Sequence, residues 1–160
     1  LVVTKCPEKL SNQEQLAIEK KLWSRIKKPV FFTTIRYSEK LKGNQKEHIA
    51  TNAIENCEVL LVTGIANPTP LLAYLETKNN SFTHLKFPDH HQFKEKDVQK
   101  IKETFEAISS DEKIILTTEK DFVRLSEKIE NLYFIEIETT FINQKSDFDN
   151  LIKSYVRSTL

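Results

Sequence analysis

The sequence predicts an α/β fold in which a small, mainly parallel sheet carries helices on both faces. Two observations support this fold. Predicted strands and helices alternate from residue 59 onward, which is typical of parallel sheets. In addition, the strands expected at residues 59–62 and 114–116 are continuously apolar, as strands covered on both faces are.

The individual elements follow from local signals. Ser11 and Thr118 each begin a capping box, and Asn67 precedes a proline that suits the first turn of a helix. Apolar residues spaced three or four apart predict the last helix. The expected strands are 1–4, 30–37, 59–62, 82–87, 114–116 and 132–137, and the expected helices are 11–28, 67–77, 95–108, a short one after 118, and 147–158.

Composition narrows the possible functions. The 160 residues correspond to about one domain, or one domain with a piece of another. Because 24 Lys and Arg residues face 23 Asp and Glu residues, the net charge of +1 excludes a strongly basic nucleic-acid binder. Cys6 and Cys57 have no C-x-x-C spacing and are interpreted as reduced thiols.

Glycine content and the first residues point to a piece of a longer protein. The two glycines, Gly43 and Gly64, are too far apart for G-x-x-x-x-G-K-[ST] or G-x-G-x-x-G, so this chain carries no standard phosphate-binding loop. The chain has no methionine and opens with an apolar run, whereas a natural terminus rarely begins inside a buried strand.

Three unusual loops, 63–68, 87–93 and 117–121, follow predicted strands. Ligands of parallel α/β sheets bind at the carboxyl ends of the strands, so we expect these loops to share one edge. Together they supply an acid, two imidazoles, a lysine and the free amides of helix N-termini, which favour anions such as phosphate. This edge is the predicted functional site.

The triplet Asp89-His90-His91 carries the clearest chemical signal at this edge. A histidine oriented by a carboxylate can act as a general base, but adjacent loop histidines can also be ordinary surface residues. A metal site is a third interpretation with less support, because His48 and His84 form no i, i+4 pair.

The other two loops have structural interpretations as well. Gly64 can serve only to turn the chain, and Asn67 can serve only to cap a helix. Thr118 with Asp121 forms a capping box by default, which leaves Lys120 in solvent. These interpretations stand beside the functional one.

Four segments, taken in order, resemble one known family. They are 2–7 (VVTKCP), 62–68 (VTGIANP), 87–93 (FPDHHQF) and 116–121 (LTTEKD). In these segments the chain resembles the tetraacyldisaccharide 4′-kinases, or lipid A 4′-kinases. The similarity spans nearly all of this chain but only about the second half of the family's length.

The resemblance implies a P-loop kinase of two α/β/α lobes, which transfers the γ-phosphate of ATP to the 4′-hydroxyl of a tetraacyldisaccharide 1-phosphate with Mg²⁺. It implies work at the cytoplasmic face of the bacterial inner membrane, with the lipid A precursor and the membrane surface as partners and no nucleic acid. ATP and Mg²⁺ would be bound mainly by an N-terminal P-loop lobe that this chain lacks, so the fragment alone is expected to be inactive.

The resemblance also divides the chain and assigns roles to its residues. Residues 1–28 would end the P-loop lobe, 29–57 would form a β linker, 58–140 the C-terminal α/β/α lobe and 141–160 a C-terminal helix. His90, with Asp89 beside it, matches the family histidine that pairs with an aspartate of the P-loop lobe to activate the sugar hydroxyl. The residues expected to bind substrate or phosphate are Lys120, Asn67 and His91, and those expected to hold the nucleotide are Thr4 and Lys5, with no metal ligand assigned.

Two alternatives belong to other functional classes. Asp89-His90-His91 is also a signature of a family of metal-dependent phosphoesterases, but this chain has no aspartate before Asp89 and only two glycines. A non-enzymatic module that holds an anion at its helix N-termini is the second alternative.

Overall fold

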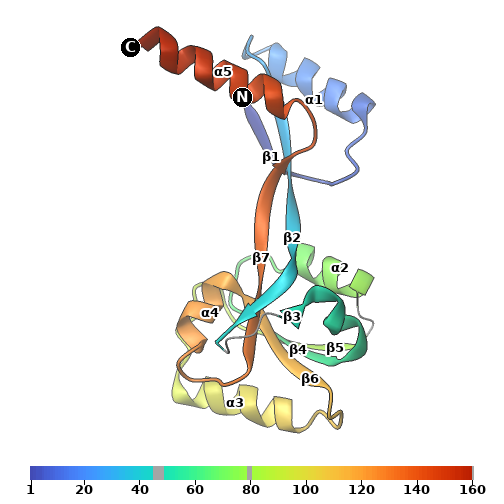
Figure 1. Cartoon of the computed structure of the whole chain (residues 1–160), viewed down its shortest axis with the longest axis vertical. Coiled ribbons are helices and arrows are strands. Elements are labelled where there is room, and N and C mark those ends of the chain that lie inside the picture. Colours follow the sequence, from blue (N-terminus) through green and yellow to red (C-terminus); the bar gives the residue numbers. More distant parts are fainter. Residues whose placement is uncertain (45–48, 79–80, 160) are drawn as a thin grey trace. The chain divides into compact units, whose positions relative to one another are not determined.

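The computed structural model describes residues 1–44, 49–78 and 81–159, and it divides the chain into two compact units. Unit 1 contains Leu1–Arg36 and Ile137–Leu160, and unit 2 contains Tyr37–Glu136 (Figure 1). His48, considered above for a metal site, lies outside the described residues. None of the helices in the described part of the chain has the length and apolar character that a membrane span requires.

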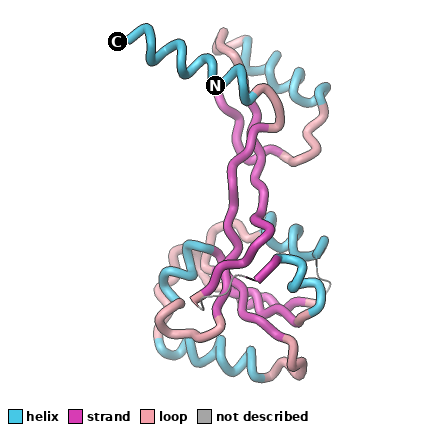
Figure 2. Tube along the Cα trace, in the orientation of Figure 1, coloured by secondary structure: helices cyan, strands magenta, loops and turns pink. Residues whose placement is uncertain are grey.

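The elements alternate as the sequence predicts (Figure 2). The strands are β1 (Val2–Cys6), β2 (Phe31–Gly43), β3 (Ile49–Ala50), β4 (Glu58–Thr63), β5 (Phe82–Lys86), β6 (Lys113–Thr118) and β7 (Leu132–Phe141). The helices are α1 (Asn12–Trp23), the 3-10 helix η1 (Thr51–Asn56), α2 (Thr69–Lys78), α3 (Glu95–Glu106), α4 (Glu119–Leu125) and α5 (Lys145–Thr159).

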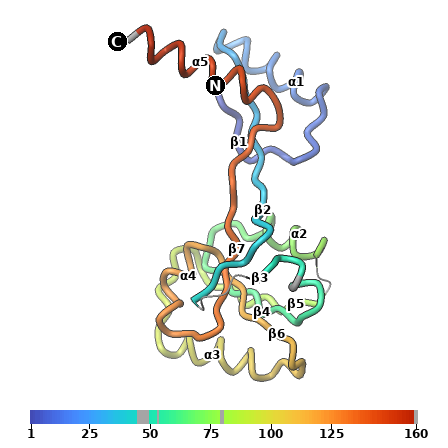
Figure 3. The backbone as a smooth tube through the Cα atoms, in the orientation of Figure 1, coloured from blue at the N-terminus to red at the C-terminus, as the bar shows by residue number. Residues whose placement is uncertain are grey.

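Unit 2 is built on a sheet with the order β2-β7-β6-β4-β5, in which β3 pairs with β2. The pairs β4/β5, β4/β6 and β6/β7 are parallel, and β2/β3 is antiparallel. The chain enters this unit along β2 and leaves it along β7 (Figure 3). The mainly parallel α/β fold is therefore confirmed.

Two apolar layers cover the sheet of unit 2 because successive residues of a strand face opposite sides. Leu60 and Val62 of β4 face a core that includes Val98 and Ile101 of α3 and Leu125 of α4. Leu61, between them in sequence, faces a second core that includes α2 and η1. The continuous apolar run of β4 is thus explained by burial on both faces, and each such side chain contributes roughly 1.5–3 kcal/mol.

Unit 1 contains β1, the first part of β2, the end of β7, and the helices α1 and α5. β1 and β2 are parallel, with Val2 opposite Phe31. The centre of the unit is aromatic: the ring of Phe31 lies 5.2 Å from that of Phe148 and 6.5 Å from that of Phe141.

Both helices of unit 1 leave apolar side chains in solvent. Trp23 of α1 is 53% exposed and Tyr155 of α5 is 70% exposed. The other exposed large apolar side chains of these two helices and the turn that follows α1 are Leu16, Ile26, Leu151, Ile152 and Val156. The helix α5 that the apolar spacing predicts is present, but most of its apolar face is exposed, with no other described residues packed over it.

Two elements end elsewhere than the sequence predicts. α1 ends at Trp23 rather than at residue 28, because the backbone bonds that follow leave the α-helical pattern: the Arg25 N–H donates to the Leu22 carbonyl three residues back, and the Lys28 N–H donates to the Ile26 carbonyl two residues back, both at 2.9 Å. β2 continues past residue 37 to Gly43, and β3 and η1 follow it. This part of β2 is mostly polar and gives only a weak apolar signal, although Leu41 is fully buried in the second core. Lys42, next to it, pairs with Glu136 at 2.7 Å.

Candidate functional site

Three loops meet at the carboxyl ends of β4, β5 and β6, as the topology of the sheet requires. The Gly64 N–H donates to Asp121 Oδ2 at 2.7 Å. The His90 N–H donates to the Gly64 carbonyl at 3.1 Å, and the Phe87 N–H donates to the Thr63 carbonyl at 2.7 Å. Hydrogen bonds therefore connect the loops 63–68, 87–93 and 117–121.

Asp89, His90 and Lys120 form an exposed cluster at this edge. His90 Nε2 lies 3.3 Å from Lys120 Nζ and 3.6 Å from Asp89 Oδ2, and Lys120 Nζ lies 3.6 Å from Asp89 Oδ1. When the Lys120 ammonium donates to this ring, Nε2 is the unprotonated nitrogen. The His90 side chain is 70% exposed, so its ring is available to an incoming proton donor.

The His90 backbone is in the left-handed region, with φ 57°. Few residues other than glycine adopt this conformation, and histidine is among those that do so more often. Its N–H donates to Asp89 Oδ1 at 3.0 Å as well as to the Gly64 carbonyl. These bonds hold the turn that projects the ring from the loop.

His91 points the other way. Its Nε2 lies 2.9 Å from Asp97 Oδ2, and its ring is stacked on Phe87 with 4.9 Å between centroids. The Lys94 N–H and, next, the His91 ring hold the pKa of the Asp97 carboxyl below its ordinary value. The assignment of His91 to substrate binding stays a prediction, and its Nε2 is already occupied by Asp97.

The remaining candidates are exposed and lie apart from these hydrogen bonds. Asn67 Oδ1 accepts from the Thr69 N–H at 3.1 Å, as the cap of α2 would. Thr4 and Lys5 lie on β1 in unit 1, where Lys5 has a left-handed backbone with φ 59°. Their roles in phosphate and nucleotide binding stay predictions.

Asp121 has a second role that the capping motif in the sequence does not reveal. This residue is 0% exposed and accepts from both the Gly64 N–H and the Thr118 hydroxyl, the latter at 2.9 Å. Arg124 Nη1 lies 3.7 Å from Asp121 Oδ1 and donates to the His91 carbonyl at 3.3 Å. An aspartate at the third position of a helix looks like an ordinary cap in sequence, so only the approach of Gly64 reveals its second function.

Metal ligands do not gather at this edge. Among residues 1–44, 49–78 and 81–159, no group of three or more His, Cys, Asp or Glu side chains could hold an ion. His91 is directed to Asp97 while His90 faces solvent, so the triplet does not converge on one point. The structure therefore gives no support to the phosphoesterase alternative.

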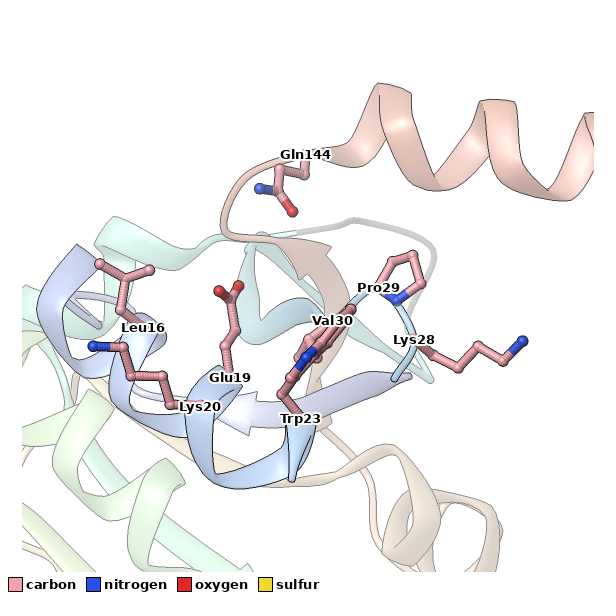
Figure 4. Close-up of a pocket in the computed structure, with 8 residues that line it drawn as sticks. All are labelled: Leu16, Glu19, Lys20, Trp23, Lys28, Pro29, Val30 and Gln144. Atoms are coloured by element: carbon pink, nitrogen blue, oxygen red, sulfur yellow. The ribbon is translucent and has the colours of Figure 1, made fainter. Parts of the chain in front are cut away.

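Unit 1 contains a hollow of about 470 Å³ next to α1 (Figure 4). Leu16, Trp23 and Val30 give it an apolar lining, while Lys20 and Lys28 add two cations. Glu19, Pro29 and Gln144 complete the lining. Among the residues that the structure describes, no histidine, cysteine, serine or threonine lines the hollow, so these residues offer no nucleophile or imidazole base of the kind found beside Lys120.

Comparison with known proteins gives a consistent result. The family model described as "Tetraacyldisaccharide-1-P 4'-kinase" matches residues 1–157. The tetraacyldisaccharide 4'-kinase of Flavobacterium psychrophilum is 40% identical, with 99% of this chain and 45% of that protein covered. Those of Flavobacterium johnsoniae and Bacteroides thetaiotaomicron are 38% and 33% identical, with 100% and 98% of this chain covered.

The solved structures add a match in fold. The crystal structure of LpxK from Aquifex aeolicus in complex with ATP is similar with a TM-score of 0.54 at 20% identity, over 81% of this chain and 37% of that one. This chain spans less than half the length of the curated relatives it matches. The match of the family model to nearly every residue confirms the resemblance, and the chain belongs to the tetraacyldisaccharide-1-P 4'-kinase family.

Proposed function

We propose that the protein containing this chain transfers the γ-phosphate of ATP to the 4′-hydroxyl of a tetraacyldisaccharide 1-phosphate in lipid A biosynthesis. The match of the family model to residues 1–157 carries this proposal. The exposed imidazole of His90 beside Asp89 and Lys120 supplies chemistry that fits it.

In this mechanism His90 Nε2 accepts the proton of the 4′-hydroxyl as its oxygen attacks the γ-phosphorus. The new O–P bond forms, the bond between the γ-phosphorus and the bridging oxygen breaks, and ADP leaves. Asp89 Oδ2, 3.6 Å from the ring, stabilises the imidazolium that results. An aspartate of the absent lobe would complete the dyad that the family resemblance implies.

Lys120 is proposed to bind phosphate oxygens. Its Nζ lies within 3.3 Å of His90 Nε2, so substrate entry must displace it from that nitrogen. The displaced ammonium is then placed to neutralise anionic phosphate oxygens, where a fixed cation contributes most. Asn67 and His91 are proposed to assist in binding the substrate, and Thr4 and Lys5 to contact the nucleotide.

ATP and Mg²⁺ would be held mainly by the remainder of the protein. ATP is present in the Aquifex aeolicus structure. This chain has two glycines, too far apart for a P-loop, and its described residues contain no cluster of metal ligands that fits Mg²⁺. No step of the reaction is therefore assigned to a metal on this chain, and the chain alone is proposed to be inactive.

The partner of unit 1 is proposed to be the remainder of the same protein. A P-loop lobe would cover the exposed apolar side chains of α1 and α5, which lie within residues 1–28 and 141–160. Residues 29–57 would form the linker, and residues 58–140 the C-terminal lobe. Unit 1 also has eleven Lys and Arg residues against six Asp and Glu residues. That excess suits a protein that works at the anionic cytoplasmic face of the inner membrane.

Phosphate transfer from radiolabelled ATP to the tetraacyldisaccharide 1-phosphate tests the proposal. The full-length protein should label the lipid, and the 160-residue chain should not. Labelling by the chain alone would contradict the proposed division of labour, and no labelling by the folded full-length protein would contradict the proposed reaction.

A further inference from the structure

The carboxylate of Asp121 is buried close to the exposed cluster of Asp89, His90 and Lys120. Asp121 has no accessible surface, yet the proposed reaction does not use it. Burying a carboxylate is unfavourable unless hydrogen bonds and opposite charge compensate. Its Oδ2 accepts at 2.7 Å and 2.9 Å from the Gly64 N–H and the Thr118 hydroxyl, and Arg124 Nη1 lies 3.7 Å from its Oδ1.

The peptide groups of Gly64 connect Asp121 to His90. The N–H of Gly64 donates to Asp121, and its carbonyl accepts from the His90 N–H at 3.1 Å. The junction is tight: a Cβ on Gly64 would lie 3.1 Å from Asp121 Oδ1 and 3.4 Å from both the His91 Cβ and the Pro88 carbonyl oxygen. A shift of Asp121 therefore reaches the His90 backbone through one residue.

Arg124 makes a second connection to the same loop. Its Nη1 lies between Asp121 Oδ1 and the His91 carbonyl, to which it donates at 3.3 Å. The His90 N–H is thus connected to Asp121 through Gly64, and the His91 carbonyl is held by Arg124. Both residues of α4 therefore act on the backbone next to the His90 side chain. A left-handed backbone such as that of His90 persists only where its surroundings fix it.

We propose that Asp121 is a positioning residue that holds His90, through Gly64 and Arg124, in the orientation needed to accept the proton of the substrate hydroxyl. This inference rests on the proposed function. Lys120 precedes Asp121 in α4, so the same anchor also fixes the cation next to the imidazole. A displacement of about 1 Å in such a site can lower a rate on the order of 100-fold.

The test is a double-mutant cycle in the full-length enzyme. Asp121→Asn should lower kcat on the order of 100-fold with little change in KM for ATP or lipid. In the His90→Ala background, Asp121→Asn should have little further effect, because the two residues act as one unit. Leu125→Ala, a buried apolar change in the same helix, controls for instability and should leave kcat of the folded enzyme near wild type.

Gly64→Ala provides a second variant if Asp121→Asn does not fold. Its added methyl group presses on the same junction and should reproduce the fall in kcat. Hydrogen exchange of the His90 amide should become faster in both variants. A fall in kcat that Leu125→Ala matches at an equal loss of Tm, or one that persists in full in the His90→Ala background, would overturn the inference.

The two proposals can fail separately. If His90→Ala leaves kcat unchanged, the base assigned in the proposed function is wrong. The exchange rate of the His90 amide then still decides whether Asp121 positions the loop: faster exchange in Asp121→Asn supports it, and an unchanged rate overturns it.

Discussion

The two units of the chain differ in how completely they bury their apolar residues. In unit 2, Leu60 and Leu61 face opposite cores, and both are fully covered by helices of the same unit. In unit 1, Trp23 and Tyr155 lie more than half exposed on α1 and α5. Unit 2 thus has a complete core of its own, whereas unit 1 leaves much apolar surface exposed, as its proposed contact with the remainder of the protein requires.

The largest expected effect is in the core of unit 2. Leu61→Ala should lower the free energy of unfolding by about 2–5 kcal/mol, because it leaves a cavity in a fully packed layer. Leu151→Ala on the exposed face of α5 should change it by about 0.5 kcal/mol or less. Urea denaturation of the 160-residue chain, followed by circular dichroism, measures both changes. Equal losses of unfolding free energy in the two variants would show that the two units do not differ in burial as described.

A smaller effect is expected when the exposed face of α5 is made polar. Ile152→Asp should lower the Tm of the full-length protein, because a charge is then buried against the remainder of the chain. The same change should leave the Tm of the 160-residue chain nearly constant, since Ile152 is 46% exposed there. Ser154→Asp, on the same helix, serves as the matched control. Equal Tm shifts in the two proteins would show that α5 is not covered by the missing part.

The smallest expected effect is a difference in how the stability of the two units depends on pH. Burial, followed by the charge of Lys86, lowers the pKa of His84 in unit 2 below its ordinary value of 6.5. The neutral ring therefore contributes stability that is present above pH 6.5 and is lost as pH falls through the lowered pKa. In unit 1 the hydrogen bonds from Ser11 lower the pKa of Glu14 below 4.5, so its contribution is lost only at more acidic pH.

Urea titrations between pH 7.5 and pH 5 check this prediction. His84→Gln should flatten the fall in stability across that range, whereas Glu14→Gln should leave its slope unchanged. An identical slope in wild type and His84→Gln would remove the role assigned to His84, whose Nε2 lies 2.8 Å from the Thr63 hydroxyl oxygen.

The fold was predictable wherever burial leaves a mark on the sequence. The run at 59–62 is apolar throughout because both of its faces are covered, and Ser11 and Thr118 cap helices as their spacing indicates. The extension of β2 to Gly43 was not predictable, because most of its residues there are polar and Leu41 is an isolated fully buried side chain among them.

The candidate site was predictable in outline but not in detail. The topology of a parallel sheet places the loops after β4, β5 and β6 at one edge, so the proximity of His90 and Lys120 follows from strand order. The inward turn of His91 depends on Phe87 and Asp97, and the burial of Asp121 depends on Gly64. Gly64 and Asp121 are 57 residues apart, and the contacts of His91 depend on the shape of its loop, so neither arrangement is visible in a linear pattern.

We propose that His90, and not its neighbour His91, accepts the proton of the substrate hydroxyl. The most direct measurement is kcat of the full-length enzyme carrying His90→Ala or His91→Ala, with the lipid substrate at saturation and Tm recorded for both. We predict that His90→Ala lowers kcat on the order of 100-fold or more, as loss of a general base does, and that His91→Ala lowers it far less. Equal losses of kcat in the two variants at equal Tm would contradict the role proposed for His90.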